Sequence, residues 1–219
     1  MYKSQVGQDQ WVHSVLGDKR GGYFVELGAS DGVDLSNTYF FEKQLGWNGI
    51  CIEPNPTFHA DLEKNRSSNI SHYCASDRDN HELEFAICGH TSGTLVTAGP
   101  FTRSSTIVKV KTQTLASIFS FFEAPPVIDY LSLDVEGHEL EVLKGFPFDK
   151  YKFNCITVEH NEPHTGPGMQ RALRELLVAH GYVFVKGNDD VHRWGHGPID
   201  DFYIHSSLNH AIAESNRRC

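Results

Sequence analysis

Carboxylate side chains recur in this sequence directly after short apolar runs, at the points where buried strands are expected to end. Glu26 and Asp31 flank a glycine turn, Glu53 closes the next apolar run, and Asp134 and Glu136 follow a later one. In an open α/β sheet such positions lie along the carboxyl edge of the strands, where ligands bind. A carboxylate buried there is costly unless it is paired. We therefore expect these acids to meet polar or cationic groups of a ligand.

The glycine turn decides which ligand is expected. A dinucleotide site has the spacing Gly-x-Gly-x-x-Gly, whose bare amides face a pyrophosphate. Here Gly28 and Gly32 stand four residues apart, and the carboxylates of Glu26 and Asp31 would repel a pyrophosphate. They suit the amine and sulfonium of S-adenosylmethionine, although a plain strand-to-helix turn with solvated acids is the alternative. The cofactor contacts predicted at this turn are Glu26, Gly28, Ala29, Ser30, Asp31 and Gly32.

Further cofactor contacts are expected at the ends of the neighbouring strands. Glu53 follows Glu26 by about one βαβ unit, where such folds place an acid on a ribose diol, and Pro54 ends the strand. Residues 36–38 either hold the methionine end of the ligand or cap a helix. Residues 76–77 either bond the adenine amine or form a turn. The candidates in this group are Ser36, Asn37, Thr38, Glu53, Pro54, Ser76, Asp77 and also Asp134.

Asp134, Glu136 and His160 are the candidates for catalysis. If the strand before them persists, Asp134 and Glu136 point to one face, and His160 ends the next strand at the same edge. An acceptor hydroxyl must lose its proton to a base, and the intrinsic pKa of His160 suits that task. Asp134 could itself be the base, orient the imidazole or bind the cofactor amine. All three could instead hold a divalent cation such as Mg²⁺, which lowers the pKa of the hydroxyl. In the alternative, the two acids cap a helix and His160 packs at the surface.

Strands and helices alternate along the chain to position these residues. We see no internal repeat and no linker, so we predict one domain over residues 1–219, with an N-terminal helical segment at 1–20 and a polar tail at 206–219. The predicted strands are 23–27, 49–53, 70–75, 82–88, 106–111, 127–134, 153–159, 182–186 and 201–205.

Composition argues against several other classes of protein. The chain has 219 residues, of which 39% are hydrophobic, enough for one α/β domain with a sizeable core. The formal net charge of −9 argues against a nucleic-acid partner. We find no run long enough to span a membrane and no signal peptide. The strand-like runs around four cysteines indicate buried thiols in a reducing compartment, so we expect a cytoplasmic protein. These are Cys51, Cys74, Cys88 and Cys155.

Taken together, these segments resemble the FkbM family of S-adenosylmethionine-dependent methyltransferases. The likeness runs in order from about Ser4 to Tyr203. Many methyltransferases share the glycine turn, but Glu-Pro-Asn-Pro at 53–56 and Asp-Val-Glu-Gly-x-Glu at 134–139 are much more particular. One departure is His138, where the family usually has a small residue. The matching segments are 24–32, 36–38, 46–56, 131–139, 142–145 and 157–161.

The resemblance implies a class I methyltransferase fold. This is a Rossmann-like α/β architecture with a seven-stranded, mostly parallel sheet in the order 3-2-1-4-5-7-6, an antiparallel last strand, and helices on both faces. It also implies O-methylation of a hydroxyl, often on a sugar, glycan or natural product. Our main hypothesis is therefore an S-adenosylmethionine-dependent O-methyltransferase with a small-molecule or glycan acceptor. The alternatives are a non-catalytic module that binds S-adenosylmethionine and a nicotinamide-dependent sugar-modifying enzyme.

Overall fold

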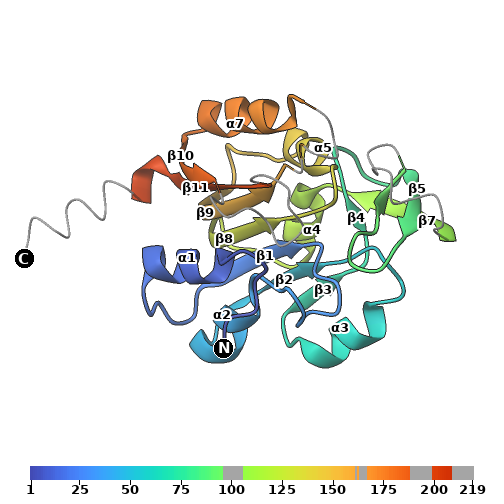
Figure 1. The fold of residues 1–219 in the computed structure, drawn as a ribbon, viewed down its shortest axis with the longest axis horizontal. Coiled ribbons are helices and arrows are strands. Elements are labelled where there is room, and N and C mark those ends of the chain that lie inside the picture. The colour runs from blue at the N-terminus through green and yellow to red at the C-terminus, as the bar shows by residue number, and fades with distance from the viewer. Residues whose placement is uncertain (96–105, 161, 163–166, 188–198, 209–219) are drawn as a thin grey trace, which may run out of the picture.

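Seven strands form the central sheet of the protein, seen in a computed structural model that describes residues 1–95, 106–160, 162, 167–187 and 199–208 (Figure 1). They are β1 (Tyr23–Leu27), β2 (Asn48–Ile52), β3 (Asn69–Ser71), β8 (Val127–Leu133), β9 (Lys152–Glu159), β10 (Tyr182–Gly187) and β11 (Asp200–His205). They lie side by side as β3-β2-β1-β8-β9-β11-β10. Counted 1 to 7 along the chain, this order reads 3-2-1-4-5-7-6.

The sheet is mixed. Strands β1, β2, β3, β8 and β9 pair in parallel, whereas β11 is antiparallel to both β9 and β10. Because parallel strands all end at the same edge, the residues that follow β1, β2, β8 and β9 meet there. This edge gathers most of the acids that the sequence analysis singled out.

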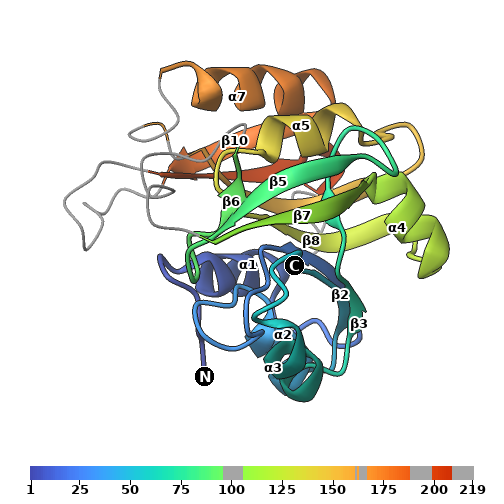
Figure 2. The same cartoon turned by 90° about the vertical axis from the view of Figure 1, so that its right-hand side faces the viewer.

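Helices cover both faces of the sheet, as the sequence predicted (Figures 1 and 2). Successive side chains of a strand point to opposite faces of the sheet, so Phe24 packs on one face and Val25 on the other. Both are fully buried, which requires helices on each face. The Phe24 face carries α1 (Gln8–Leu16), α2 (Tyr39–Leu45) and α3 (His59–Asn65). The Val25 face carries α4 (Leu115–Phe121), α5 (Glu139–Lys144) and α7 (Met169–Ala179).

A second, four-stranded sheet lies beside the first, with its strands in the order β4-β7-β5-β6 (Figure 1). The sequence predicted one strand over residues 70–75, but the strand is interrupted at His72 and Tyr73. Its first part stays in the central sheet as β3, and its second part joins the other sheet. The strands of this sheet are β4 (Cys74–Ala75), β5 (Glu82–Ile87), β6 (Gly93–Thr94) and β7 (Thr106–Gln113).

The glycine turn after β1 brings two strand ends into contact. Gly28 has φ 73°, a left-handed conformation that glycine adopts at no steric cost. A Cβ atom at this position would lie 2.0 Å from the backbone oxygen of Asp134. Only glycine therefore allows the turn after β1 to pack against the segment after β8.

Two other sequence predictions can be compared with the structure. Cys51, Cys74 and Cys155 are buried as expected, but Cys88 is only half-buried because it follows the end of β5. Among the described helices, none is both long and apolar enough to cross a lipid bilayer. The predicted tail extends beyond residue 208, so most of it lies outside the described residues.

Candidate functional site

A cavity of about 600 Å³ opens at the carboxyl edge of the central sheet. Its wall includes the glycine turn, the ends of β2, β8 and β9, the second sheet, the loop at 89–92 and the N-terminal Gln5 and Gln8. This volume is in the range of pockets that bind small molecules and cofactors. The predicted site residues that line the cavity are Glu26, Gly28, Ala29, Ser30, Ser36, Asn37, Glu53, Pro54, Asp134 and Glu136.

Glu53 lies in the cavity wall with both carboxylate oxygens held in place. Oε2 accepts the Ser30 N–H at 2.8 Å, and Oε1 accepts the Asn55 N–H at 2.7 Å. Only 5% of the residue is exposed, and burial raises the pKa of Glu53 to about 7. Each carboxylate oxygen can accept a further hydrogen bond. Glu53 can therefore accept two hydroxyl groups, which is what a ribose diol would offer.

Glu26 also reaches the cavity, but the protein itself satisfies its carboxylate. The Ser36 hydroxyl donates at 2.9 Å, the Asn37 N–H at 2.6 Å and the Thr38 hydroxyl at 2.7 Å. Arg66 Nη1 lies 2.9 Å from Glu26 Oε2, and both side chains are buried. Glu26 thus fixes the segment 36–38 against the sheet, and direct contact with a cationic cofactor stays a prediction.

The sequence analysis missed Arg66, whose guanidinium also pairs with Glu42 at 2.8 Å. Burial opposes ionisation of Glu42, but the charge of Arg66 and nearby donors hold the pKa of Glu42 at about 2. No pattern around Arg66 distinguishes it from a surface arginine. The signal available was the excess of acids at the turn, because a buried carboxylate such as Glu26 needs a counter-charge.

Asn37 offers the cavity a hydrogen-bond acceptor that no described residue uses. Its side-chain nitrogen donates to the Ser132 hydroxyl at 2.8 Å, which fixes the orientation of the amide. The buried Oδ1 atom has no hydrogen-bond partner among the described residues. Buried polar atoms rarely lack a partner, so Oδ1 is suited to accept from an amine or hydroxyl of a ligand.

Five predicted cofactor contacts are absent from the described cavity wall: Asp31, Gly32, Thr38, Ser76 and Asp77. Asp31 caps its own turn, where Oδ1 accepts the N–H groups of Val33 and Asp34 at 2.8 and 2.9 Å. Asp77 pairs with Arg78 at the surface. Their roles in cofactor binding stay predictions to which these positions lend no support.

His160 follows the end of β9 at the same edge of the sheet as Asp134, as expected from the sequence, but it does not line the described cavity wall. Strand β9 ends at Glu159, and neighbouring side chains on a strand point to opposite faces. Glu159 consequently lines the cavity, whereas His160 is buried outside its described wall, with Nε2 3.3 Å from the Gln170 amide nitrogen. Burial lowers the pKa of His160. Glu159, and not the His160 that the sequence analysis proposed for catalysis, therefore lines this cavity among the described residues.

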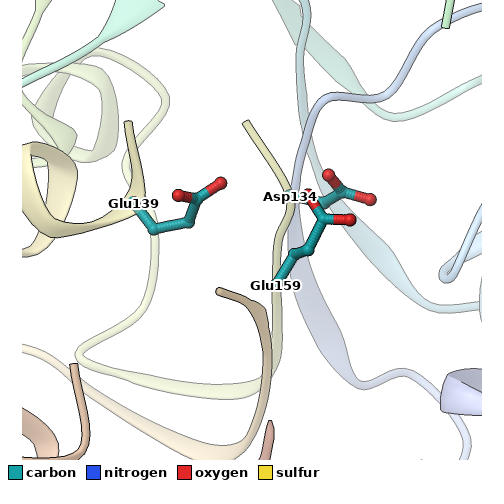
Figure 3. A group of neighbouring side chains, drawn as sticks. All are labelled: Asp134, Glu139 and Glu159. Carbon is teal, nitrogen blue, oxygen red and sulfur yellow. The ribbon is translucent and has the colours of Figure 1, made fainter. Parts of the chain in front are cut away.

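The carboxylates of Asp134, Glu139 and Glu159 form a group (Figure 3), in which each offers one oxygen within 4.8 Å of the others. Asp134 and Glu159 line the cavity. The strand predicted at 127–134 ends at Leu133, and Glu136 has φ 57°, so the condition under which Asp134 and Glu136 would share one strand face is not met. Glu136 still lines the cavity, and burial raises its pKa to about 9. The predicted cation set of Asp134, Glu136 and His160 does not come together as one group. Only Asp134 belongs to the cluster that the structure forms.

Comparisons with known proteins agree with this architecture. A family model described as "Methyltransferase FkbM domain" matches residues 26–184, and no curated protein matches the chain significantly. Among solved structures, the chain is similar to a candidate rRNA-methylase from Clostridium thermocellum, with a TM-score of 0.52 and 11% identity over 94% of this chain and 97% of the other.

Two further structures have TM-scores of 0.50. One is precorrin-6y C5,15-methyltransferase from Geobacter metallireducens GS-15, at 10% identity over 90% of this chain and 86% of the other. The second is Aeropyrum pernix fibrillarin in complex with natively bound S-adenosyl-L-methionine, at 12% identity over 93% of this chain and 75% of the other. At such low identities the similarity concerns the fold alone. It confirms the class I methyltransferase architecture.

Proposed function

This chain belongs to the FkbM methyltransferase family, and we propose that it transfers a methyl group from S-adenosylmethionine to a hydroxyl of a small-molecule or glycan acceptor. The observation that carries the proposal is Glu53, a buried carboxylate in the cavity wall whose two oxygens are fixed by backbone N–H groups. An acid at the end of the second parallel strand is placed to bind a ribose diol.

The cavity residues fit S-adenosylmethionine at both of its ends. Glu53 would accept hydrogen bonds from the ribose hydroxyls, and Oδ1 of Asn37, which has no partner among the described residues, would accept one from the methionine amine. The turn at Gly28 lets the backbone approach the ligand closely, because no side chain intervenes. When bound, the cofactor supplies an electrophilic methyl group on a sulfonium.

We propose Asp134 as the base that takes the proton of the acceptor hydroxyl. It lines the cavity, whereas His160, the other candidate, lies outside the described wall. Burial raises the pKa of Asp134, and the charge of Glu26 adds to this rise. A carboxylate with a raised pKa is a stronger base than an ordinary aspartate. The protein must also hold the hydroxyl oxygen in line with the methyl group.

The acceptor would enter beside the N-terminal segment. Gln5 and Gln8 line the cavity, and Asp9 on α1 anchors the residues before the helix, because its carboxylate accepts the N–H of Lys3 at 2.7 Å. The Gln8 amide also bonds within the protein, since its nitrogen donates to Asp200 at 3.3 Å and its oxygen accepts the Val6 N–H at 2.9 Å. One of the similar structures is an rRNA-methylase by name, but the net charge of −9 and the acids of this cavity disfavour an RNA acceptor for this chain.

Production of S-adenosylhomocysteine tests the proposal. Purified protein is incubated with S-adenosylmethionine and a panel of sugars, glycosides and phenols, and acceptor-dependent product is measured. Tight cofactor binding without product from any acceptor would favour a non-catalytic binding module. Calorimetric titration with NAD⁺ and NADP⁺ serves as the control. Binding of either nucleotide in place of S-adenosylmethionine would favour the nicotinamide-dependent alternative.

A further inference from the structure

The carboxylates of Asp134, Glu139 and Glu159 come from three consecutive elements of the chain. Asp134 follows β8, Glu139 is the first residue of α5, and Glu159 is the last residue of β9. Each offers one oxygen, and these three oxygens all lie within 4.8 Å of one another. In Figure 3 the carboxylates of Asp134 and Glu159 lie next to each other, and that of Glu139 is turned toward them.

Two oxygens of this cluster lack the hydrogen bonds that buried atoms normally make. Glu139 is fully buried, and its Oε1 accepts the N–H groups of Val135 and Gly137 at 2.9 and 3.1 Å. Its Oε2 has no partner among the described residues, and the same is true of the buried Oε2 of Glu159. Such atoms cost free energy unless a ligand or ion satisfies them.

The charge of the cluster is likewise unbalanced. Within the described ranges, no lysine, arginine or histidine forms an ion pair with any of the three, in contrast to Glu26 and its partner Arg66. Burial raises the pKa of all three, to about 7 for Glu139. The described residues therefore leave the charge of the cluster without a partner of opposite sign.

We propose that Asp134, Glu139 and Glu159 together bind one hard divalent cation, such as Mn²⁺, Mg²⁺ or Ca²⁺. An all-oxygen, carboxylate-rich donor set is the kind that these cations prefer. Opposite ligands of Ca²⁺ at about 2.4 Å lie about 4.8 Å apart, and those of Mg²⁺ at about 2.1 Å lie about 4.2 Å apart. Oxygens that all lie within 4.8 Å of one another are therefore close enough to share one such ion. This set replaces the one expected from the sequence, because it contains Glu139 and Glu159 in place of Glu136 and His160.

The site opens to the cavity through Asp134 and Glu159, both of which line it. On the proposed function, an acceptor hydroxyl that reaches the cation would lose its proton more readily. This consequence rests on the proposed function, but cation binding itself does not.

Titration of Mn²⁺ into the chelator-treated 219-residue chain without S-adenosylmethionine tests the site. Calorimetry and the electron paramagnetic resonance signal of free Mn²⁺ should both report one bound ion, which Mg²⁺ or Ca²⁺ displaces. Glu139→Gln keeps the Oε1 acceptor but removes the charge, and should weaken Mn²⁺ binding at least tenfold. Glu159→Gln should do the same. The matched control is Glu141→Gln, which lies on the same helix beside Lys144 at the surface and should bind like the wild type.

Two results would overturn the inference. One is the absence of Mn²⁺ binding to the folded wild type at concentrations on the order of 1 mM, the weak end of protein sites. The other is unchanged affinity in both Glu139→Gln and Glu159→Gln. Titration of S-adenosylhomocysteine into the same samples separates this failure from failure of the proposed function, since each ligand is measured without the other. Retained nucleoside binding in the variants also shows that they are folded.

Discussion

Replacing Glu53 by glutamine probes the cofactor site most sharply. Glutamine keeps the shape of the side chain and one carbonyl oxygen, but it turns the second oxygen into an NH₂ group. That group would face either the Ser30 or the Asn55 N–H, both of which now donate to the carboxylate. One hydrogen bond is then lost, and two donors oppose each other.

The effect on stability should depend on pH. Burial raises the pKa of Glu53 from 4.5 to about 7, so the folded state holds this proton more tightly than the unfolded state. The wild type therefore loses stability from this group as the pH rises from about 4.5 to about 7, in total about 3 kcal/mol at about 1.4 kcal/mol per pKa unit. Glutamine removes that loss, but the lost hydrogen bond costs about 1–3 kcal/mol at any pH. The variant should be less stable than the wild type at pH 5 and close to it at pH 8.

The effect on the cofactor should be a loss of affinity. Hydrogen bonds to a charged acceptor are each worth about 1.5–3 kcal/mol. Weakening two such bonds to the ribose by about 3 kcal/mol in total would reduce the affinity about 100-fold. Calorimetry with S-adenosylhomocysteine at pH 8 measures this, and urea unfolding at pH 5 and pH 8 measures the stability. Glu63→Gln, on the exposed face of α3, is the matched control.

Two outcomes would refute this reasoning. An affinity within twofold of the wild type in a folded Glu53→Gln variant would remove Glu53 from the ribose site. A stability difference between variant and wild type that is the same at pH 5 and pH 8 would show that the buried carboxylate does not carry a raised pKa.

Three further predictions follow from the geometry of the site. Arg66→Met should destabilise the protein by about 3–5 kcal/mol in urea unfolding, because it leaves the buried Glu26 without its counter-charge; a loss below about 1 kcal/mol would contradict the role given to the pair. Gly28→Ala should reduce S-adenosylhomocysteine affinity more than tenfold, because the new methyl group would collide with the backbone oxygen of Asp134, and unchanged binding would show that the turn is not part of the site. His160→Ala should retain turnover within about tenfold, because the imidazole lies outside the described cavity wall. A fall of 10²–10⁴-fold with intact cofactor affinity would restore His160 as the base.

Hydrophobic patterning predicted most strands of the central sheet because they are short and buried on both faces. The strand at Tyr23–Leu27 is one example, because an apolar run after a glycine pair identifies a buried strand without knowledge of the tertiary contacts. The split of residues 70–75 between two sheets was missed, since Cys74 and Ala75 continue the apolar pattern of β3. Their pairing with β7 depends on a strand more than 30 residues away.

The site residues that the sequence predicted correctly for the cavity wall are those whose position depends only on where a strand ends. Glu53 and Asp134 follow parallel strands directly, so both reach the cavity. Arg66, Glu139 and Glu159 were not predicted, because their positions depend on loop geometry and on which of two neighbouring side chains turns inward. Whether Glu159 or His160 faces the cavity depends on a shift of one residue along the strand, and the hydrophobic pattern does not determine that shift.

A crystal structure with S-adenosylhomocysteine tests the central claim most directly. We expect the nucleoside in the cavity at the carboxyl edge of the sheet, with both ribose hydroxyls within hydrogen-bond distance of the Glu53 carboxylate and the amine near Asn37 Oδ1. A ribose bound away from Glu53, or a nucleoside held outside the cavity, would contradict the proposed function.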